Sequence, residues 1–345
     1  MKALVRDPQG SIEWRTGLEK PAGQVRLEFE AAFVDPLALG SFREDGKLNG
    51  NGHQSILGWS CVGRIASLEN KSAGLVVGQR VAVFNSVVCG ECPDCQAGNP
   101  SACSGRNSTF GEPGCFCSSP AIEAAAVYPV PDGMSPSRAA LAGEFARLYR
   151  AVDMARDNCE RFEIAVVFGL NPAGIRVINL LLELGFNQVI AVDPCVNRRG
   201  LATQQGATMA FGPGEYTDWV AYDRRSRTHD LAIINSTVQE SFSAALLAAG
   251  TRAVVLVFNT PASDCLTLDH VLRTVIQKEL LIQGVFWLWR EDISRAMKEL
   301  VPDDDIVSME IETIPFDTAS IKRLKCASAA PDSRCYLLVA DSSTA

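Results

Sequence analysis

The clearest pattern of hydrophobic and polar positions lies in residues 164–193. A run of β-branched residues, Ile164–Phe168, leads into a turn with two glycines and then into apolar residues at helical spacing. Gly185 ends the predicted helix, and a second apolar run, Val189–Val192, ends at Asp193. The pattern therefore predicts a strand, a crossover helix and a second, parallel strand.

Upstream of this unit the chain is richer in short apolar runs, separated by glycine-containing turns. These runs predict strands at Met1–Val5, Val25–Phe33, Ser55–Ala66 and Val81–Phe84. Short strands with frequent turns favour a β-rich domain of barrel type. A helical pattern begins near Ser135, where a Ser-Pro pair is a plausible helix start.

Downstream of Asp193 the alternation of helix and strand continues. Helices are expected at Arg198–Gln205 and Asp292–Leu300, and strands at Leu231–Ile234, Ala253–Phe258, Leu280–Val285, Met309–Ile314 and Tyr336–Ala340. Strands that alternate with helices indicate a doubly wound parallel sheet. We therefore predict an α/β protein in which residues 147–285 form the parallel-sheet domain. Residues 1–146 and 286–345 together form the β-rich domain.

Composition supports two domains, because 345 residues exceed what one compact core usually holds. The net charge of −8 argues against nucleic acid or an anionic membrane as a partner, and no apolar run is long enough to span a bilayer. The first residues lack the pattern of a signal peptide, so a cytoplasmic protein is expected. Twelve cysteines in such a chain suggest metal binding and free thiols.

The turn from Gly169 to Gly174 opens a helix, and free backbone N–H groups at a helix N-terminus bind phosphate. Asp193, at the end of the second strand, would accept hydrogen bonds from ribose hydroxyls and favour NAD over NADP. Dinucleotide-binding turns often have the pattern G-x-G-x-x-G. Asn171 stands at the position of its middle glycine. Asparagine tolerates positive φ, but its side chain would crowd a pyrophosphate. The expected cofactor-binding residues are Gly169, Asn171, Pro172, Ala173, Gly174, Asp193 and Arg198. Arg198 would stack on adenine or cap a helix.

Four cysteines lie close together in the β-rich part: Cys89, Cys92, Cys95 and Cys103. Thiolates at spacings of three, three and eight residues can surround one tetrahedral Zn²⁺ ion. Four sulfur ligands leave no open position, so the lobe of about residues 89–103 is predicted to hold a structural zinc.

Together these motifs resemble the medium-chain dehydrogenase/reductase family, which includes zinc alcohol, sorbitol and threonine dehydrogenases. The segment Ile56–Gly63, the segment Gly78–Val83 and the cysteine lobe match stretches of that family. The resemblance implies a GroES-like catalytic domain joined to a Rossmann domain. It also implies an NAD(H) cofactor, one structural Zn²⁺ per subunit, a small-molecule substrate and a homodimer or homotetramer.

The catalytic zinc ligands of that family are not matched. Val34 falls at the cysteine position, and Trp59 and Ser60 fall at the His-Glu pair. Only Glu144 matches a position where sorbitol-type members carry a glutamate. An alternative alignment would place His53 in this region, but the glycine spacing favours Gly58 as the anchor. We therefore expect no catalytic zinc, because valine and tryptophan cannot bind it.

Three functions stay open on the sequence. In the first, Glu144 or Asp35 acts as the acid/base for an alcohol–carbonyl couple, beside Trp59 and Ser60. In the second, an activated C=C or C=N bond accepts hydride without a metal, and Trp59 offers a stacking face. In the third, the chain binds a nucleotide or serves as a scaffold without catalysis.

Overall fold

The structure is a computed structural model. It describes residues 1–7, 11–19, 24–34, 55–69, 74–84, 88–104, 114–222, 228–236, 239–258, 268–286, 288–300, 311–329 and 335–340. The predicted acid/base Asp35 and the alternative residue His53 lie outside the described residues. The chain divides into two compact units. The first contains Met1–Ala146, Phe286–Ala330 and Arg334–Ala345, and the second contains Arg147–Val285 and Pro331–Ser333.

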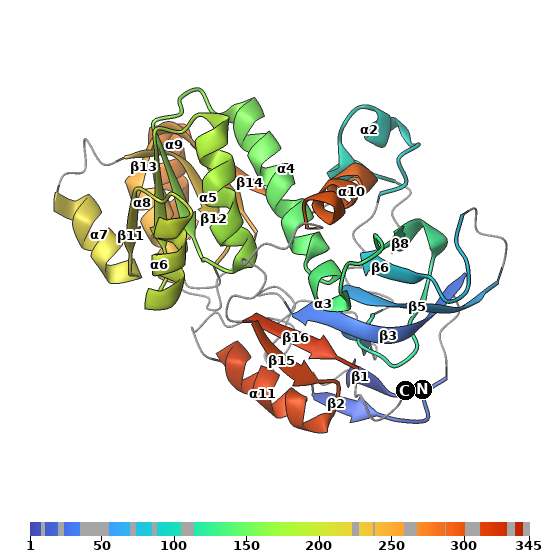
Figure 1. Cartoon of the computed structure of the whole chain (residues 1–345). Coiled ribbons are helices and arrows are strands. Elements are labelled where there is room, and N and C mark those ends of the chain that lie inside the picture. The colour runs from blue at the N-terminus through green and yellow to red at the C-terminus, as the bar shows by residue number, and fades with distance from the viewer. Residues whose placement is uncertain are drawn as a thin grey trace. The chain divides into compact units, whose positions relative to one another are not determined.

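The first unit is built on two β-sheets. The larger one has the strand order β15-β16-β3-β5-β6-β8, with β7 paired to β3, and the smaller has the order β2-β1-β4. The strands are β1 (Ala3–Arg6), β2 (Ile12–Arg15), β3 (Val25–Val34), β4 (Ser55–Ile56), β5 (Ser60–Leu68), β6 (Arg80–Phe84), β7 (Ala121–Ile122), β8 (Val127–Pro129), β15 (Ile311–Pro315) and β16 (Cys335–Val339). Strands from both ends of the chain thus share one sheet, as Figure 1 shows.

Short helices accompany these sheets. They are α2 (Pro93–Gln96), α3 (Pro136–Ala139), α10 (Arg290–Glu299) and α11 (Thr318–Ala329). Ser135 caps α3, because its side chain accepts a hydrogen bond from the backbone N–H of Arg138. The predicted strand Ser55–Ala66 is interrupted at Gly58, which has a φ of +89°. A Cβ there would lie 2.3 Å from the ring of Phe116, so the break requires glycine.

The second unit contains a six-stranded parallel sheet in the order β11-β10-β9-β12-β13-β14. Its strands are β9 (Ile164–Phe168), β10 (Gln188–Val192), β11 (Met209–Phe211), β12 (His229–Ile234), β13 (Ala249–Val257) and β14 (Leu281–Gly284). Its helices are α4 (Ala142–Asn158, which begins in the first unit), α5 (Pro172–Leu184), α6 (Val196–Gln204), α7 (Pro213–Tyr222), α8 (Gln239–Ala248) and α9 (Leu268–Lys278).

The strand order runs outward in both directions from β9 and β12. Parallel crossovers are right-handed, so helices on the β10 side and on the β13 side cover opposite faces of the sheet. α5 packs against α6, and α8 packs against both α7 and α9. This is the doubly wound Rossmann arrangement, and the point where the order reverses lies between β9 and β12.

The sequence missed several elements. Among the described residues these are α2, α7, α8, α9, α11, β2, β7, β8 and β11. The helix expected from Arg198 begins two residues earlier, at Val196. These differences follow from short or irregular apolar patterns: α7, for example, contains Gly214 and Thr217 among its ten residues.

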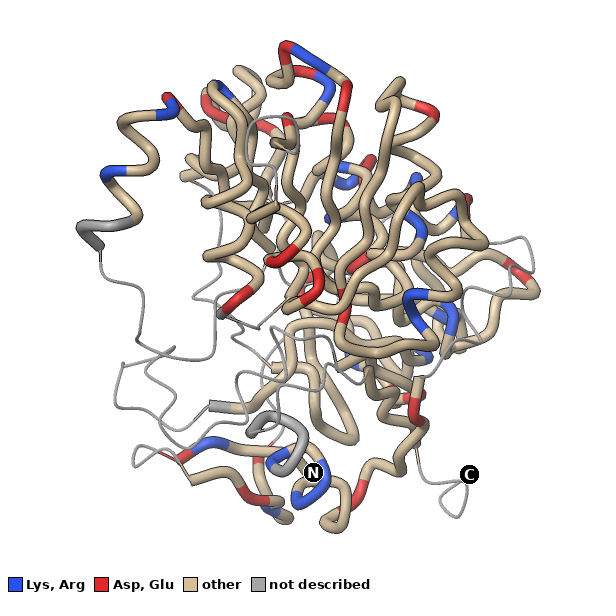
Figure 2. The backbone as a smooth tube through the Cα atoms, turned by 90° about the vertical axis from the view of Figure 1, so that its left-hand side faces the viewer, with Lys and Arg blue, Asp and Glu red and all other residues tan. Residues whose placement is uncertain are grey.

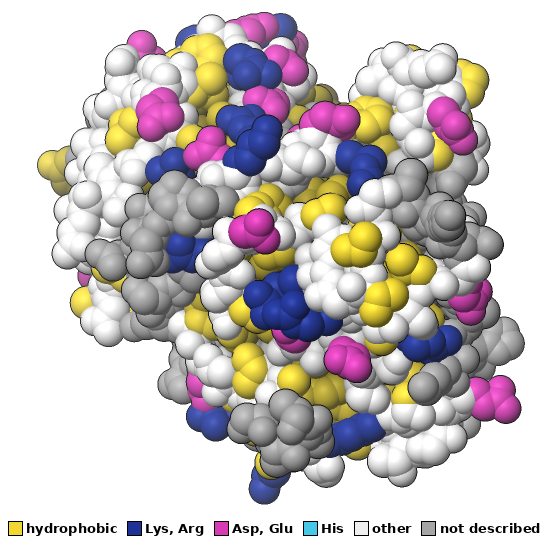
Figure 3. Space-filling model, turned by 45° about the vertical axis from the view of Figure 1, so that its right-hand side comes forward, with side chains coloured by type: hydrophobic (Ala, Val, Ile, Leu, Met, Phe, Trp, Pro, Cys, Tyr) yellow, Lys and Arg dark blue, Asp and Glu magenta, His cyan; other side chains and the backbone are white. Residues whose placement is uncertain are grey.

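Charged side chains of both signs are interspersed along the described chain. Figure 2 shows Lys and Arg alternating with Asp and Glu on the backbone, and the face in Figure 3 mixes the two signs in the same way. Within the described ranges, none of the helices has the length and apolar character that a bilayer crossing needs.

Candidate active site and metal centre

The glycine turn after β9 has two positions that only glycine can fill. Gly169 has a φ of +90°, and a Cβ on it would lie 2.4 Å from the carbonyl oxygen of Asn235. A Cβ on Gly174 would lie 2.1 Å from the carbonyl oxygen of Gly169. The turn therefore combines a left-handed residue with close packing of the helix against the strand, as dinucleotide-binding turns do.

Asn171 is placed differently from what the sequence suggested. Its φ is −63° and its ψ is 173°, so it has ordinary extended backbone and not the left-handed conformation. Its side chain caps α5, because Oδ1 accepts a hydrogen bond of 2.8 Å from the backbone N–H of Gly174. The same oxygen accepts a second hydrogen bond of 2.8 Å from Nδ2 of Asn235.

The carboxylate of Asp193 is fully buried at the end of β10. Oδ2 accepts a hydrogen bond from the N–H of Leu170, and Oδ1 accepts one from the N–H of Cys195, both at 2.8 Å. Burial raises the pKa of Asp193, while the charge of Arg198 and the two N–H donors act in the opposite direction. The carboxylate thus orders both the glycine turn and the start of α6.

Arg198 is also buried, and its Nη1 lies 3.6 Å from Oδ2 of Asp193. The guanidinium therefore forms an ion pair with the strand-end carboxylate. The two roles that the sequence suggested for Arg198, adenine stacking and helix capping, stay predictions. The pair places both charges at the same edge of the sheet as the glycine turn.

Sequence reasoning missed the polar residues that follow β12. Asn235, Ser236 and Ser241 are all buried, and the hydroxyl of Ser241 donates to that of Ser236 at 3.3 Å. They face the glycine turn across the point where the strand order reverses, which is where open α/β sheets bind ligands. The sequence does contain an indication of them, because the polar residues Asn235 and Ser236 directly follow the apolar run Leu231–Ile234.

Three residues that the sequence singled out in the first unit, Val34, Trp59 and Ser60, lie at or next to the ends of neighbouring strands. Val34 is the last residue of β3, and Ser60 is the first of β5. The β3–β5 register pairs Ala31 with Val62, and its continuation leads from Val34 to Trp59. Both Val34 and Trp59 belong to the same buried apolar cluster. Trp59 also lies with its ring 6.0 Å from that of Phe286.

Glu144 lies in the first turn of α4. It is 4% exposed. A Cβ on the preceding residue, Gly143, would lie 2.6 Å from the ring of Phe84, and Phe84 is paired with Ser60 in the sheet. The glycine therefore lets the helix start approach the strand ends. The residue before the buried Glu144 therefore lies against Phe84, the neighbour of Ser60 in the sheet.

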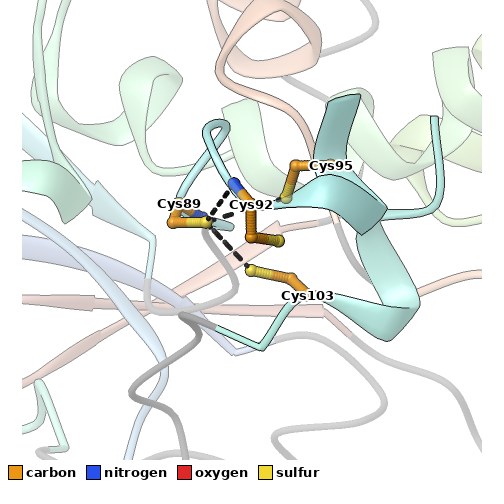
Figure 4. Close-up of side chains that lie close together, drawn as sticks. All are labelled: Cys89, Cys92, Cys95 and Cys103. Carbon is orange, nitrogen blue, oxygen red and sulfur yellow. Dashed lines mark hydrogen bonds between the residues drawn. The ribbon is translucent and has the colours of Figure 1, made fainter. Parts of the chain in front are cut away.

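The four cysteines of the lobe converge on one point. Their sulfur atoms all lie within 4.8 Å of one another, and Figure 4 shows the thiol groups turned toward a common centre. Sγ of Cys89 lies 3.9 Å from that of Cys95 and 3.5 Å from that of Cys103. A tetrahedral zinc with Zn–S bonds of about 2.3 Å needs sulfur atoms about 3.8 Å apart. The cluster therefore fits zinc and is typical of a structural zinc site.

Backbone N–H groups of the lobe already stabilise thiolate at two of these positions. Donors from Cys95 and Ser104 lower the pKa of Cys92 to about 5, and donors from Glu91 and Cys92 lower that of Cys89. Burial raises the pKa of Cys95 to about 12. Zinc binds cysteine as the thiolate, and the lowered pKa values favour the thiolate form of Cys89 and Cys92 without the metal.

His229 lies apart from these groups, at the start of β12 in the core of the second unit. Its Nδ1 lies 3.4 Å from the hydroxyl of Tyr216. Burial, helped by the charge of Lys278, lowers the pKa of His229 to about 3. The imidazole is therefore neutral at physiological pH and has a structural role.

Comparison with known proteins agrees with this architecture. Residues 21–132 match the alcohol dehydrogenase GroES-like domain. L-threonine 3-dehydrogenase of Serratia proteamaculans is 26% identical over 236 residues, which is 67% of this chain and 67% of that protein. The match thus spans about two thirds of each chain.

Two solved structures share the fold over nearly the whole length. Galactitol-1-phosphate dehydrogenase of Escherichia coli has a TM-score of 0.76 at 19% identity and covers 98% of this chain and 100% of that one. An alcohol dehydrogenase of Escherichia coli CFT073, described as short chain and in complex with NADH, has a TM-score of 0.72 at 20% identity. That match covers 98% of this chain and 99% of the other. At sequence identities of 19% and 20%, the structural similarity shows a shared fold, not a shared activity.

Proposed function

We propose that this chain is a medium-chain, NAD(H)-dependent oxidoreductase that transfers hydride without a catalytic zinc. Its similarity to the alcohol dehydrogenase GroES-like domain and to L-threonine 3-dehydrogenase supports the family. The observation that carries the proposal is a glycine turn at the reversal point of a doubly wound sheet, beside a buried strand-end carboxylate. The second unit would hold the cofactor through Gly169, Ala173, Gly174 and Asp193. When bound, NAD(H) supplies the hydride acceptor or donor of the reaction.

The absence of a catalytic zinc is inferred from residue chemistry. Val34 and Trp59 offer no ligand atoms, so a zinc in that place would have only Glu144 and the hydroxyl of Ser60 among the described residues. In the part of the chain that the structure describes, the lobe cysteines are the one group of three or more His, Cys, Asp or Glu ligands that meet. One structural zinc per chain is the expected content.

Without a metal, a protein group must handle the hydroxyl proton of an alcohol substrate. Glu144 is suited to this role because it is a buried carboxylate at the start of a helix, close to the ends of β5 and β6. Asp35 is the alternative proton acceptor from the sequence. We propose a small alcohol or carbonyl compound as the substrate. The carboxylate would take up the hydroxyl proton of the alcohol, and the hydride would pass from the carbon that carries this hydroxyl to bound NAD⁺.

A second function is supported by Trp59. By the resemblance of the sequence it falls where the family has a metal-binding histidine, and it is 8% exposed. An electron-poor C=C bond or an iminium accepts hydride without a Lewis acid, and an indole face attracts a cationic substrate. A C=C or C=N reductase of this kind would ignore simple alcohols, which distinguishes it from the first proposal.

Nucleotide binding is the direct test of both proposals. We expect NADH to bind with micromolar affinity and NADPH at least about tenfold more weakly, because a carboxylate at the ribose repels a 2′-phosphate. A titration followed by the fluorescence of bound NADH or NADPH measures the two dissociation constants. Asp193→Asn, which keeps the size of the side chain and removes its charge, should bring the two constants closer together.

If neither nucleotide binds the folded wild-type protein, the oxidoreductase proposals are wrong and a scaffold role takes their place. Tighter binding of NADPH than of NADH would contradict only the assigned role of Asp193.

We also propose that the chain forms a dimer through β14. This strand is the edge of the six-stranded sheet, and it carries neither proline nor a charged residue that would protect an edge. Leu281 is 40% exposed on it, and Ile276 of the adjacent α9 is 73% exposed. Two copies of such an edge can pair about a twofold axis and bury both residues.

Leu281→Lys is expected to convert this dimer into a monomer, because the pairing would bury two ammonium groups without partners. Light scattering coupled to size-exclusion chromatography measures the mass. Val196→Lys is a suitable control, since Val196 is an exposed apolar residue of α6, away from β14. A wild-type protein that is monomeric at micromolar concentration would contradict the proposed interface.

A further inference from the structure

The first turn of α5 has few backbone N–H groups left for a ligand. Pro172 has no N–H, and the N–H of Gly174 is donated to Oδ1 of Asn171. The N–H of Ile175 is donated to the carbonyl oxygen of Asn171, and that of Leu170 to Asp193. Most of these N–H groups, which would otherwise bind a pyrophosphate, thus already donate to acceptors of the protein itself.

A phosphate at a helix N-terminus binds through the N–H groups of the first turn. The carboxamide oxygen of Asn171 occupies one of these, at Gly174, in the place where the ligand oxygen would be. A dinucleotide must therefore bind without this donor or displace the carboxamide. Displacement is feasible, because a hydrogen bond to an anionic oxygen is roughly twice as strong as one to a neutral oxygen.

Asn235 holds the carboxamide of Asn171 in this position. Its Nδ2 donates to Oδ1 of Asn171 at 2.8 Å, and both side chains are 2% exposed. Asn235 follows β12, whereas Asn171 follows β9, so the contact joins the two strand ends at the reversal point of the sheet. The backbone of Asn235 also packs against Gly169, where any Cβ would meet its carbonyl oxygen.

We propose that Asn171, positioned by Asn235, is an affinity-determining residue that occupies the phosphate cradle in the free protein and is displaced by the diphosphate of the cofactor. This inference rests on the proposed nucleotide binding. It predicts that in the free protein the N–H of Gly174 is bonded to Asn171. Without the carboxamide oxygen, this N–H can donate to a phosphate. The ligand class is a nucleoside diphosphate or a dinucleotide.

The test compares two variants of equal size. Asn171→Ala removes the competing oxygen, whereas Asn171→Ser keeps an oxygen that can cap the same N–H. Isothermal titration with ADP and with NADH should show binding about tenfold tighter for Asn171→Ala than for the wild type. For Asn171→Ser we expect affinities within about twofold of the wild type, because the cap is retained.

The helix-capping role of Asn171 can also be tested without a ligand, through the thermal stability of the two variants. Without nucleotide, Asn171→Ala should unfold at a lower temperature than Asn171→Ser, since only alanine leaves the N–H of Gly174 without an acceptor. If the wild type binds ADP and NADH and Asn171→Ala binds them no more tightly, the inference is wrong and the proposed function stands. If neither ligand binds the wild type or either folded variant, both are wrong.

Discussion

Replacing Cys103 by serine is expected to remove the bound zinc, from about one ion per chain to almost none. The four sulfur atoms lie within 4.8 Å of one another. Its buried apolar cluster consists of Val88, Cys95 and Cys103, with Cys92 and Trp289 packed against it. The metal therefore supplies most of the stabilisation of this segment.

The variant should also be less stable. Losing about 3 kcal/mol, a modest part of what a structural zinc contributes, lowers the midpoint of thermal unfolding by about 6–12 °C in a domain of this size. Elemental analysis and a thermal unfolding curve are the two measurements. Cys159→Ser is the matched control, because Cys159 is a partly buried thiol of the second unit, outside the cluster.

Two results would contradict this assignment. One is wild-type protein that contains no zinc after purification without chelators, since the cluster would then have another role. The other is two tightly bound zinc ions per chain. The second ion would contradict the proposed metal-free hydride transfer, because the lobe offers sulfur ligands for one ion only.

The features that sequence predicts well are local. The strand Ile164–Phe168 has the same bounds in the structure as in the pattern, because its apolar run, its turn and the following helix are contiguous. The spacing of the lobe cysteines likewise lies within one loop and a short helix. A β-rich part and a parallel α/β sheet followed from such local patterns, and the resemblance to medium-chain dehydrogenases implied the GroES-like and Rossmann domains that are found.

The features that sequence missed depend on residues far apart in the chain. The side chain of Asn171 turns toward Gly174 because Asn235, 64 residues away, holds it there. Helix α9 was overlooked although Val271, Leu272, Val275 and Ile276 have helical spacing. Two of them, Leu272 and Ile276, are exposed, so this helix has a wider apolar surface than one core-facing stripe needs.

The approach of the start of α4 to Phe84 also depends on long-range packing. Gly143 matters there because Phe84, on β6, takes the space that a Cβ would occupy. No spacing rule in the sequence relates a glycine at the start of a helix to an aromatic residue about sixty positions earlier. The residue types of the candidate site were therefore accessible from the sequence, but their arrangement was not.

Glu144→Gln is expected to lower the turnover of an alcohol substrate by about 10²–10⁴-fold, the usual contribution of a general acid or base. Glutamine has nearly the same shape as glutamate but cannot take up the hydroxyl proton, so the dissociation constant of NADH should stay within about twofold. Steady-state kinetics and an NADH titration of the same preparations separate the two effects. Glu291→Gln is a suitable control, because Glu291 is an exposed glutamate in the first turn of α10.

The outcome assigns the proton acceptor. A large loss of turnover with unchanged nucleotide affinity places Glu144 in the reaction. Retained turnover removes Glu144 from the mechanism and leaves Asp35→Asn as the next variant to measure. If both variants keep full activity on an iminium or activated alkene and none of the proteins oxidises alcohols, the reductase function is favoured, because such a substrate needs no carboxylate to take its proton.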